Sequence, residues 1–76
     1  MFTEERTELE HRIARRQELR ERLADSCNAR KEAKARGDEM TIARERTRAA
    51  YLTTFITRLN DEIHEQSRAL GIQIEE

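Results

Sequence analysis

The chain has 76 residues, about half the length of a usual domain, so it can form one small domain but not two independent cores. Charged residues make up 41%, hydrophobic residues 36% and aromatics 4%; proline is absent and glycine occurs twice, which is typical of long, solvent-exposed helices. This composition excludes a β-sandwich or a doubly wound sheet, and a net charge of -1 gives no overall attraction to nucleic acid or an anionic membrane.

The first predicted element is a helix over residues 4–36, for which Thr3 is a candidate N-cap. Its heptad pattern is weak, because Arg16 and Arg30 fall at a positions where an apolar residue is expected. We therefore expect a narrow and interrupted apolar stripe. Its apolar members are Leu9 and Leu23 at a, Leu19 and Ala33 at d, and Ile13 and Cys27 at the adjoining e position.

A break in helical propensity follows, and it places a turn at residues 37–38. Gly37 can take the left-handed conformation that ends a helix, and Asp38 can cap the next one. The second predicted helix covers residues 39–70. A second glycine can end it, which leaves a short tail at residues 71–76.

The second helix has a strong heptad pattern, which predicts a coiled-coil seam. Continued forward, the pattern of the first helix is out of phase with it by two residues, which argues against one continuous helix. A dimer of long helices is the alternative to a hairpin. The seam positions are Ile42, Ala49, Ile56, Ile63 and Leu70, with Glu45, Leu52, Leu59 and Gln66 three residues later.

A hairpin folded at the turn pairs residues whose numbers have a constant sum, because antiparallel helices rise equally on both sides. Leu19 and Ile56 add to 75, and Ile13 and Ile63 add to 76. The predicted fold class is therefore all-α, a two-helix antiparallel coiled-coil hairpin that forms a single domain over residues 1–76. Its expected core is Leu9, Ile13, Leu19, Leu23, Ile42, Leu52, Ile56, Leu59 and Ile63.

A lone hairpin buries little apolar surface, and chains below roughly 70–80 residues seldom gain more than about 3–5 kcal/mol from such a core. Apolar side chains outside the seam therefore indicate a second contact. Tyr51 and Phe55 lie four residues apart on one flank of the second helix, and Met40 lies near the turn. Further apolar residues lie at the open end, namely Phe2, Ile72 and Ile74.

We expect either a homodimeric four-helix bundle or a helical protein partner against this flank. The candidate partner-binding residues are Tyr51, Phe55, Met40, Leu52 and Leu59. Residues 30–48 hold seven Lys and Arg against four Asp and Glu, while residues 59–76 hold one against five. This pattern is typical of helix-dipole complementation with ordinary i to i+4 solubility pairs, and the alternative is electrostatic steering of a protein partner. Nucleic acid would require a larger unbroken basic face.

No motif for catalysis, a cofactor or a metal is present: there is no glycine-rich phosphate loop, no His-Glu-x-x-His and no zinc spacing. His11 and His64 fall on outward faces of the expected hairpin, which predicts solvated histidines. Cys27 has no disulfide partner and is expected to be a buried or half-buried thiol. Because no apolar run has the length of a signal or membrane segment, we expect a cytoplasmic protein that does not bind membranes.

Residues Glu32 to Asp38, followed later by Phe55 to Leu59, resemble the coiled-coil domain of Gre-type transcript cleavage factors. Those proteins insert an acidic-tipped hairpin into the secondary channel of RNA polymerase. The resemblance implies that Asp38 and Glu39 lie at the tip and help to hold a catalytic magnesium ion of the polymerase. The Asn-Ala-Glu-Tyr segment that follows the tip in that family is missing from this chain.

In length and architecture the chain is also similar to the small hairpin co-chaperones of type III secretion, which shield a needle subunit together with a larger helical-repeat partner. The function expected from the sequence is a small non-enzymatic interaction module: an adaptor, co-chaperone or regulator. A polymerase effector that works through Asp38 and Glu39 is the alternative.

Overall fold

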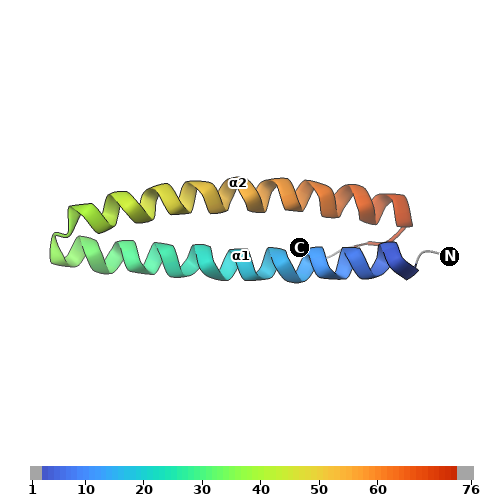
Figure 1. Ribbon diagram of the computed structural model, residues 1–76, viewed down its shortest axis with the longest axis horizontal. Helices are drawn as coiled ribbons and strands as arrows, with labels where there is room; N and C mark the ends of the chain where they lie inside the picture. Colours follow the sequence, from blue (N-terminus) through green and yellow to red (C-terminus); the bar gives the residue numbers. More distant parts are fainter. Residues whose placement is uncertain (1–2, 74–76) are drawn as a thin grey trace.

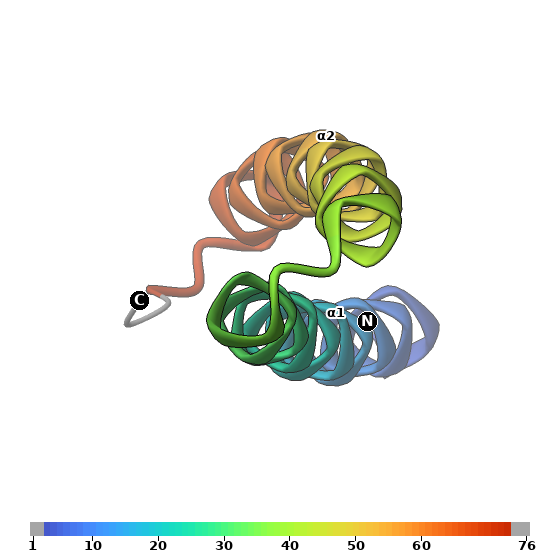
Figure 2. The same ribbon diagram turned by 90° about the vertical axis from the view of Figure 1, so that its left-hand side faces the viewer.

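The computed structural model describes residues 3–73, which form two α-helices joined by a two-residue turn. Helix α1 covers Thr3–Arg36 and helix α2 covers Glu39–Leu70. They lie side by side in opposite directions and form a rod about 55 Å long and 14–18 Å across (Figure 1). Seen from the turn, the helices cross at an angle, as in a coiled coil (Figure 2). The predicted antiparallel hairpin is confirmed.

The ends of the helices agree with the sequence to within one residue. Helix α2 has the predicted bounds, whereas α1 begins at Thr3, so that Thr3 belongs to the first turn of the helix. Glu4 and Glu5 lie in the first turn of α1, and Lys34 and Arg36 lie in its last. These charges oppose the partial charges at the two ends of the helix, which favours the helical state.

The turn combines a Schellman motif with an N-cap. The Gly37 N–H donates to the carbonyl of Lys34 at 3.2 Å, and the Asp38 N–H donates to the carbonyl of Ala33 at 2.8 Å. Gly37 has a φ of 72°, a left-handed conformation that glycine adopts without steric cost. The Asp38 carboxylate then accepts from the backbone N–H of Thr41 at 3.2 Å and so caps α2.

Helix α2 ends in the same way at the open end of the hairpin. Gly71 has a φ of 68°, and the Ile72 N–H donates to the carbonyl of Ser67 at 2.8 Å. This motif brings the half-buried Ile72 beside Leu70 and Thr3, around a shallow depression between the ends of the two helices. The first residues of the tail therefore contact the hairpin.

The apolar core is one narrow stripe between the helices, as predicted. Half-buried apolar side chains surround its buried members. The half-buried residues of the expected core are Ile13, Leu23, Ile42, Ile56 and Leu59. Cys27 is half-buried as well, in agreement with the sequence. The buried apolar residues are Leu9, Leu19, Ala33, Leu52 and Ile63.

Polar side chains share the interior with this stripe. Arg16 is only 4% exposed, and its guanidinium donates to Asn60 Oδ1 at 2.5 Å. The buried Ser26 hydroxyl lies 2.7 Å from Glu45 Oε2 and 3.1 Å from the Glu45 carbonyl oxygen. Within residues 3–73, every buried side-chain nitrogen and oxygen has a hydrogen-bond partner. The polar residues that interrupt the apolar seam therefore form hydrogen bonds between the helices.

We predict that Leu52→Ala and Ile63→Ala each lower the free energy of unfolding by about 2–5 kcal/mol, because each removes buried apolar contacts and leaves a cavity. His11→Ala is the control, since His11 is exposed, and it should change stability by less than about 0.5 kcal/mol. Urea unfolding followed by circular dichroism measures the three values. Equal stability of the Ile63 and His11 variants would contradict the observed core.

We also predict that Ser26→Ala destabilises the hairpin by about 1–3 kcal/mol, because it removes a hydrogen-bond donor from the buried Glu45 carboxylate. The double variant Ser26→Ala/Glu45→Leu should recover most of this loss, since it also removes the buried charge. Urea unfolding of the single and double variants measures the difference. A double variant less stable than the single one would show that the polar pair contributes net stability.

Candidate functional site

Two large side chains stand out on the exposed face of α2. Tyr51 is 65% exposed and Phe55 is 54% exposed. They are four residues apart and so lie one turn from each other on the same side of the helix. We call this pair the aromatic flank. Single exposed apolar residues are common on protein surfaces, whereas two adjacent aromatics on a chain that has three mark a distinct surface.

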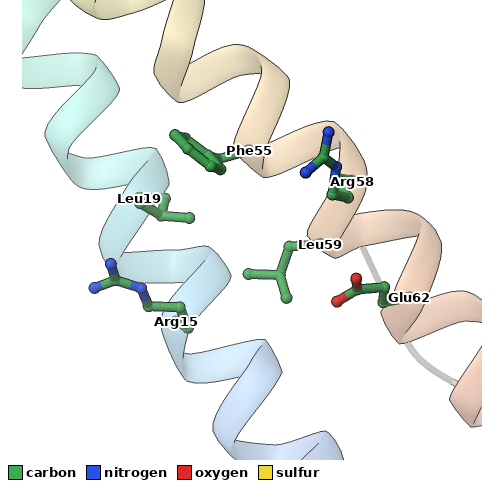
Figure 3. Close-up of a pocket in the computed structure, with 6 residues that line it drawn as sticks. All are labelled: Arg15, Leu19, Phe55, Arg58, Leu59 and Glu62. Carbon is green, nitrogen blue, oxygen red and sulfur yellow. The ribbon is translucent and has the colours of Figure 1, made fainter.

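A shallow groove of about 260 Å³ adjoins the aromatic flank, between the two helices. Phe55 and Leu59 point from α2 toward α1, and Leu19 points back toward them (Figure 3). Charged side chains surround this apolar centre, so the groove combines an apolar floor with polar edges. It is lined by Arg15 and Leu19 from α1 and by Phe55, Arg58, Leu59 and Glu62 from α2.

The structure brings together some of the predicted partner-binding residues and separates others. Phe55 and the half-buried Leu59 line the groove, and Tyr51 lies one turn away from Phe55. Leu52 is 9% exposed and packs inside the hairpin, so its side chain belongs to the core. Met40 is 86% exposed, but it lies eleven residues before Tyr51, about 16 Å along the helix.

Sequence reasoning did not identify the α1 wall of the groove. Leu19 was expected only in the core, and Arg15 was not singled out. The pairing rule contained the necessary signal, because residues with a sum near 75 lie opposite each other, which places Leu19 at the height of Phe55. The open-end candidates Phe2 and Ile74 lie outside the described residues.

The charged edge of the groove already takes part in exposed ion pairs. Arg15 pairs with Glu18 at 3.0 Å on α1, and Glu62 lies 4.0 Å from Arg12 across the hairpin. Exposed charged side chains of this kind change conformation easily, and each pair contributes roughly 0.2–1 kcal/mol. The groove can therefore accept an apolar or aromatic group at its centre while its edge charges rearrange.

The tip of the hairpin is the second predicted site. The Thr41 hydroxyl donates to Asp38 Oδ2 at 2.6 Å, and together with the Thr41 backbone N–H it holds the pKa of the Asp38 carboxyl below its usual value. Arg36, 3.9 Å from Oδ2, and Arg44 lower this pKa further. Both carboxylate oxygens of Asp38 are thus engaged in capping α2, while Glu39 is exposed beside it.

Other candidate chemistry is dispersed along the rod. Within residues 3–73, no group of three or more His, Cys, Asp and Glu side chains is arranged to hold a metal ion. His11 is exposed and His64 is half-buried. Neither α1 nor α2, the helices of the described part, is long and apolar enough to cross a membrane.

Comparison of the chain with protein-family models, with curated proteins and with solved structures gave no match in any of the three. Function must therefore be inferred from the side chains of this chain alone. Two surfaces are candidate functional sites: the aromatic flank with its adjoining groove, and the capped acidic tip.

We predict that the Asp38 carboxyl titrates below an ordinary aspartate and that Thr41→Val raises its pKa toward the usual value, because the hydroxyl donor is lost. A lowered pKa in the folded state means that the carboxylate stabilises the hairpin above the unfolded pKa near 3.8. This contribution disappears as the pH falls through the folded pKa. An NMR titration of the Asp38 side-chain carbon in both proteins measures the effect, and identical pKa values would contradict the hydrogen bond from the Thr41 hydroxyl.

Proposed function

We propose that this chain is a small non-enzymatic protein–protein interaction module that binds a helical partner, or a second copy of itself, through the aromatic flank of α2. One observation supports this more than any other: Tyr51 and Phe55 are exposed one turn apart, beside an apolar groove. Tyrosine and phenylalanine bury large areas at interfaces with little loss of conformational freedom, and such residues dominate binding energies.

The shape of the surface favours a helical partner. Helices α1 and α2 form the two walls of the groove. An amphipathic helix binds such a groove by placing its apolar residues between the walls. The small core of the hairpin adds a thermodynamic reason, since only five apolar side chains are buried among residues 3–73. A partner that covers Phe55 and Leu59 extends this core and stabilises the folded hairpin by mass action.

Within this class, an adaptor, a co-chaperone and a regulator all fit the surface. A shallow groove lined by arginine, glutamate and apolar side chains offers no nucleophile with an adjacent base, which supports a binding role over catalysis. We place the protein in the cytoplasm, because the single Cys27 is a free thiol of the kind that a reducing compartment preserves.

A polymerase effector with Asp38 and Glu39 at its acidic tip is the alternative proposal. Its support is the position of the two side chains at the end of a rod about 55 Å long. The capping contacts weaken it, since Thr41 occupies both oxygens of the Asp38 carboxylate and leaves Glu39 as the freer group.

We predict that the double change Tyr51→Ala/Phe55→Ala weakens partner binding or self-association by at least about 2 kcal/mol per aromatic, while helical content stays near that of the wild type. Both side chains are exposed, so the hairpin loses little packing. Sedimentation and quantitative pull-down measure association, and circular dichroism measures helix content.

The control for this prediction is the tip variant Asp38→Asn/Glu39→Gln, which is expected to keep association because asparagine also caps helices well. If association persists without the aromatic residues, the interaction-module proposal is wrong. If the tip variant alone then loses an effect on RNA polymerase, the effector alternative gains support.

A further inference from the structure

Helix α2 has a second heptad pattern on its exposed face, apart from the buried seam. Starting at residue 44, exposed positions follow at alternating steps of four and three residues up to residue 65. Such spacing keeps side chains on one side of a helix and is the pattern by which two helices pack against each other. We call this the outer seam, and in chain order it consists of Arg44, Arg48, Tyr51, Phe55, Arg58, Glu62 and Glu65.

The order of residues along the outer seam is self-complementary. Two arginines come first, Tyr51, Phe55 and Arg58 stand at the centre, and two glutamates come last. If an identical helix lies antiparallel with Phe55 opposite Phe55, residues with sums of 109 or 110 share the same height. Arg48 then lies opposite Glu62 of the second copy, and Arg44 opposite its Glu65. In a parallel arrangement in register, each of these side chains would instead lie opposite the same residue of the second copy, and the like charges would repel.

We infer that a second copy of this chain docks antiparallel on the outer seam, with Phe55 near the two-fold axis. The result is a dimer of hairpins, that is, a four-helix assembly. The inference is based on the proposed function, since it uses the same aromatic flank and specifies the partner. An isologous contact of this kind repeats every favourable pair twice, and it closes after two subunits.

The groove receives a side chain in this arrangement. Tyr51 of the second copy lies at the height of Arg58 and Leu59, which line the groove. Its ring covers Leu59, and the Arg58 guanidinium lies within reach of the ring face for a cation–π contact. The exposed aromatic of each copy thus fills the groove of the other.

The charge distribution of the whole hairpin favours the same orientation. Residues 30–48, near the turn, have a net charge of +3, whereas residues 3–10 and 59–73, near the open end, have net charges of -3 and -2. Two hairpins lying antiparallel bring the basic half of each against the acidic half of the other. This attraction steers association into the antiparallel orientation and disfavours the parallel one.

Charge reversal with rescue tests the arrangement, and the pair Arg44 and Glu65 suits it best. Both side chains are exposed, and neither takes part in an ion pair or hydrogen bond within residues 3–73; the Arg44 charge acts within the hairpin only by lowering the pKa of the Asp38 carboxyl. They are 21 residues apart, about 32 Å along the helix, far beyond the Debye length of about 8 Å at physiological salt. One therefore cannot compensate a change at the other within a single chain.

We expect wild-type protein to sediment as a dimer at physiological salt. Arg44→Glu and Glu65→Arg should each raise the dissociation constant of the dimer by about tenfold or more, because two attractive pairs become repulsive. The double variant Arg44→Glu/Glu65→Arg should return to within about threefold of the wild type. Arg46→Glu makes the same charge change on the same helix outside the outer seam, so it acts only through the overall charge and should raise the dissociation constant by less than about threefold.

A monomeric wild type at about 1 mM would overturn the inference, and so would a dimer in which the double variant is no tighter than the single ones. These failures are distinguishable from a failure of the proposed function. If the wild type is monomeric but Tyr51→Ala/Phe55→Ala abolishes capture of another protein, the aromatic flank still binds a partner. If the dimer survives the loss of both aromatics, the inferred arrangement is wrong, and if that loss also leaves the capture of another protein unchanged, the proposed function itself is wrong.

Discussion

The reversal of the chain at Gly37 and Asp38 is the constraint on which the remaining structure depends. Gly37 ends α1 in a left-handed conformation and Asp38 caps α2, so these two residues are the whole connection between the helices. This geometry fixes which residue of α1 lies opposite which residue of α2 along the whole rod. One added residue in the turn would shift every pair and rotate α2 by about 100° relative to its neighbour.

The polar contacts in the interior depend on that register more strictly than the apolar ones. Leucine and isoleucine side chains tolerate a small shift, because they have no directional requirement. Arg16 with Asn60 and Ser26 with Glu45 do not, since a displaced partner would leave a buried charge or hydroxyl unsatisfied. The interior therefore combines a modest apolar stripe with contacts that make one alignment much better than its neighbours.

The sequence was sufficient to predict the fold, because glycine at a phase break and a seven-residue repeat both follow from local geometry. It also placed Tyr51 and Phe55 outside the buried seam, since that follows from helical period alone. It could not show that Arg16 is buried, because an arginine at an a position can extend to solvent or turn inward to a partner on the other helix. The groove between Leu19 and Leu59 could not be predicted for the same reason. Its depth depends on the side-chain orientations of both helices together, and the sequence pattern of one helix does not determine these.

The exposed aromatics are the feature that the folding of a single hairpin does not require. Glutamate, lysine and alanine suit an exposed position on a helix better than aromatic residues do, because they have higher helix propensity and add little apolar surface. Most exposed positions of α2 have small or polar residues. Tyr51 and Phe55 depart from this pattern at adjacent turns, between a basic stretch and an acidic stretch of the same face. Apolar area at the centre supplies binding energy, whereas charges of opposite sign on its two sides supply direction. A helix with both in this order is suited to recognise another helix and to distinguish the two ways in which that helix can lie.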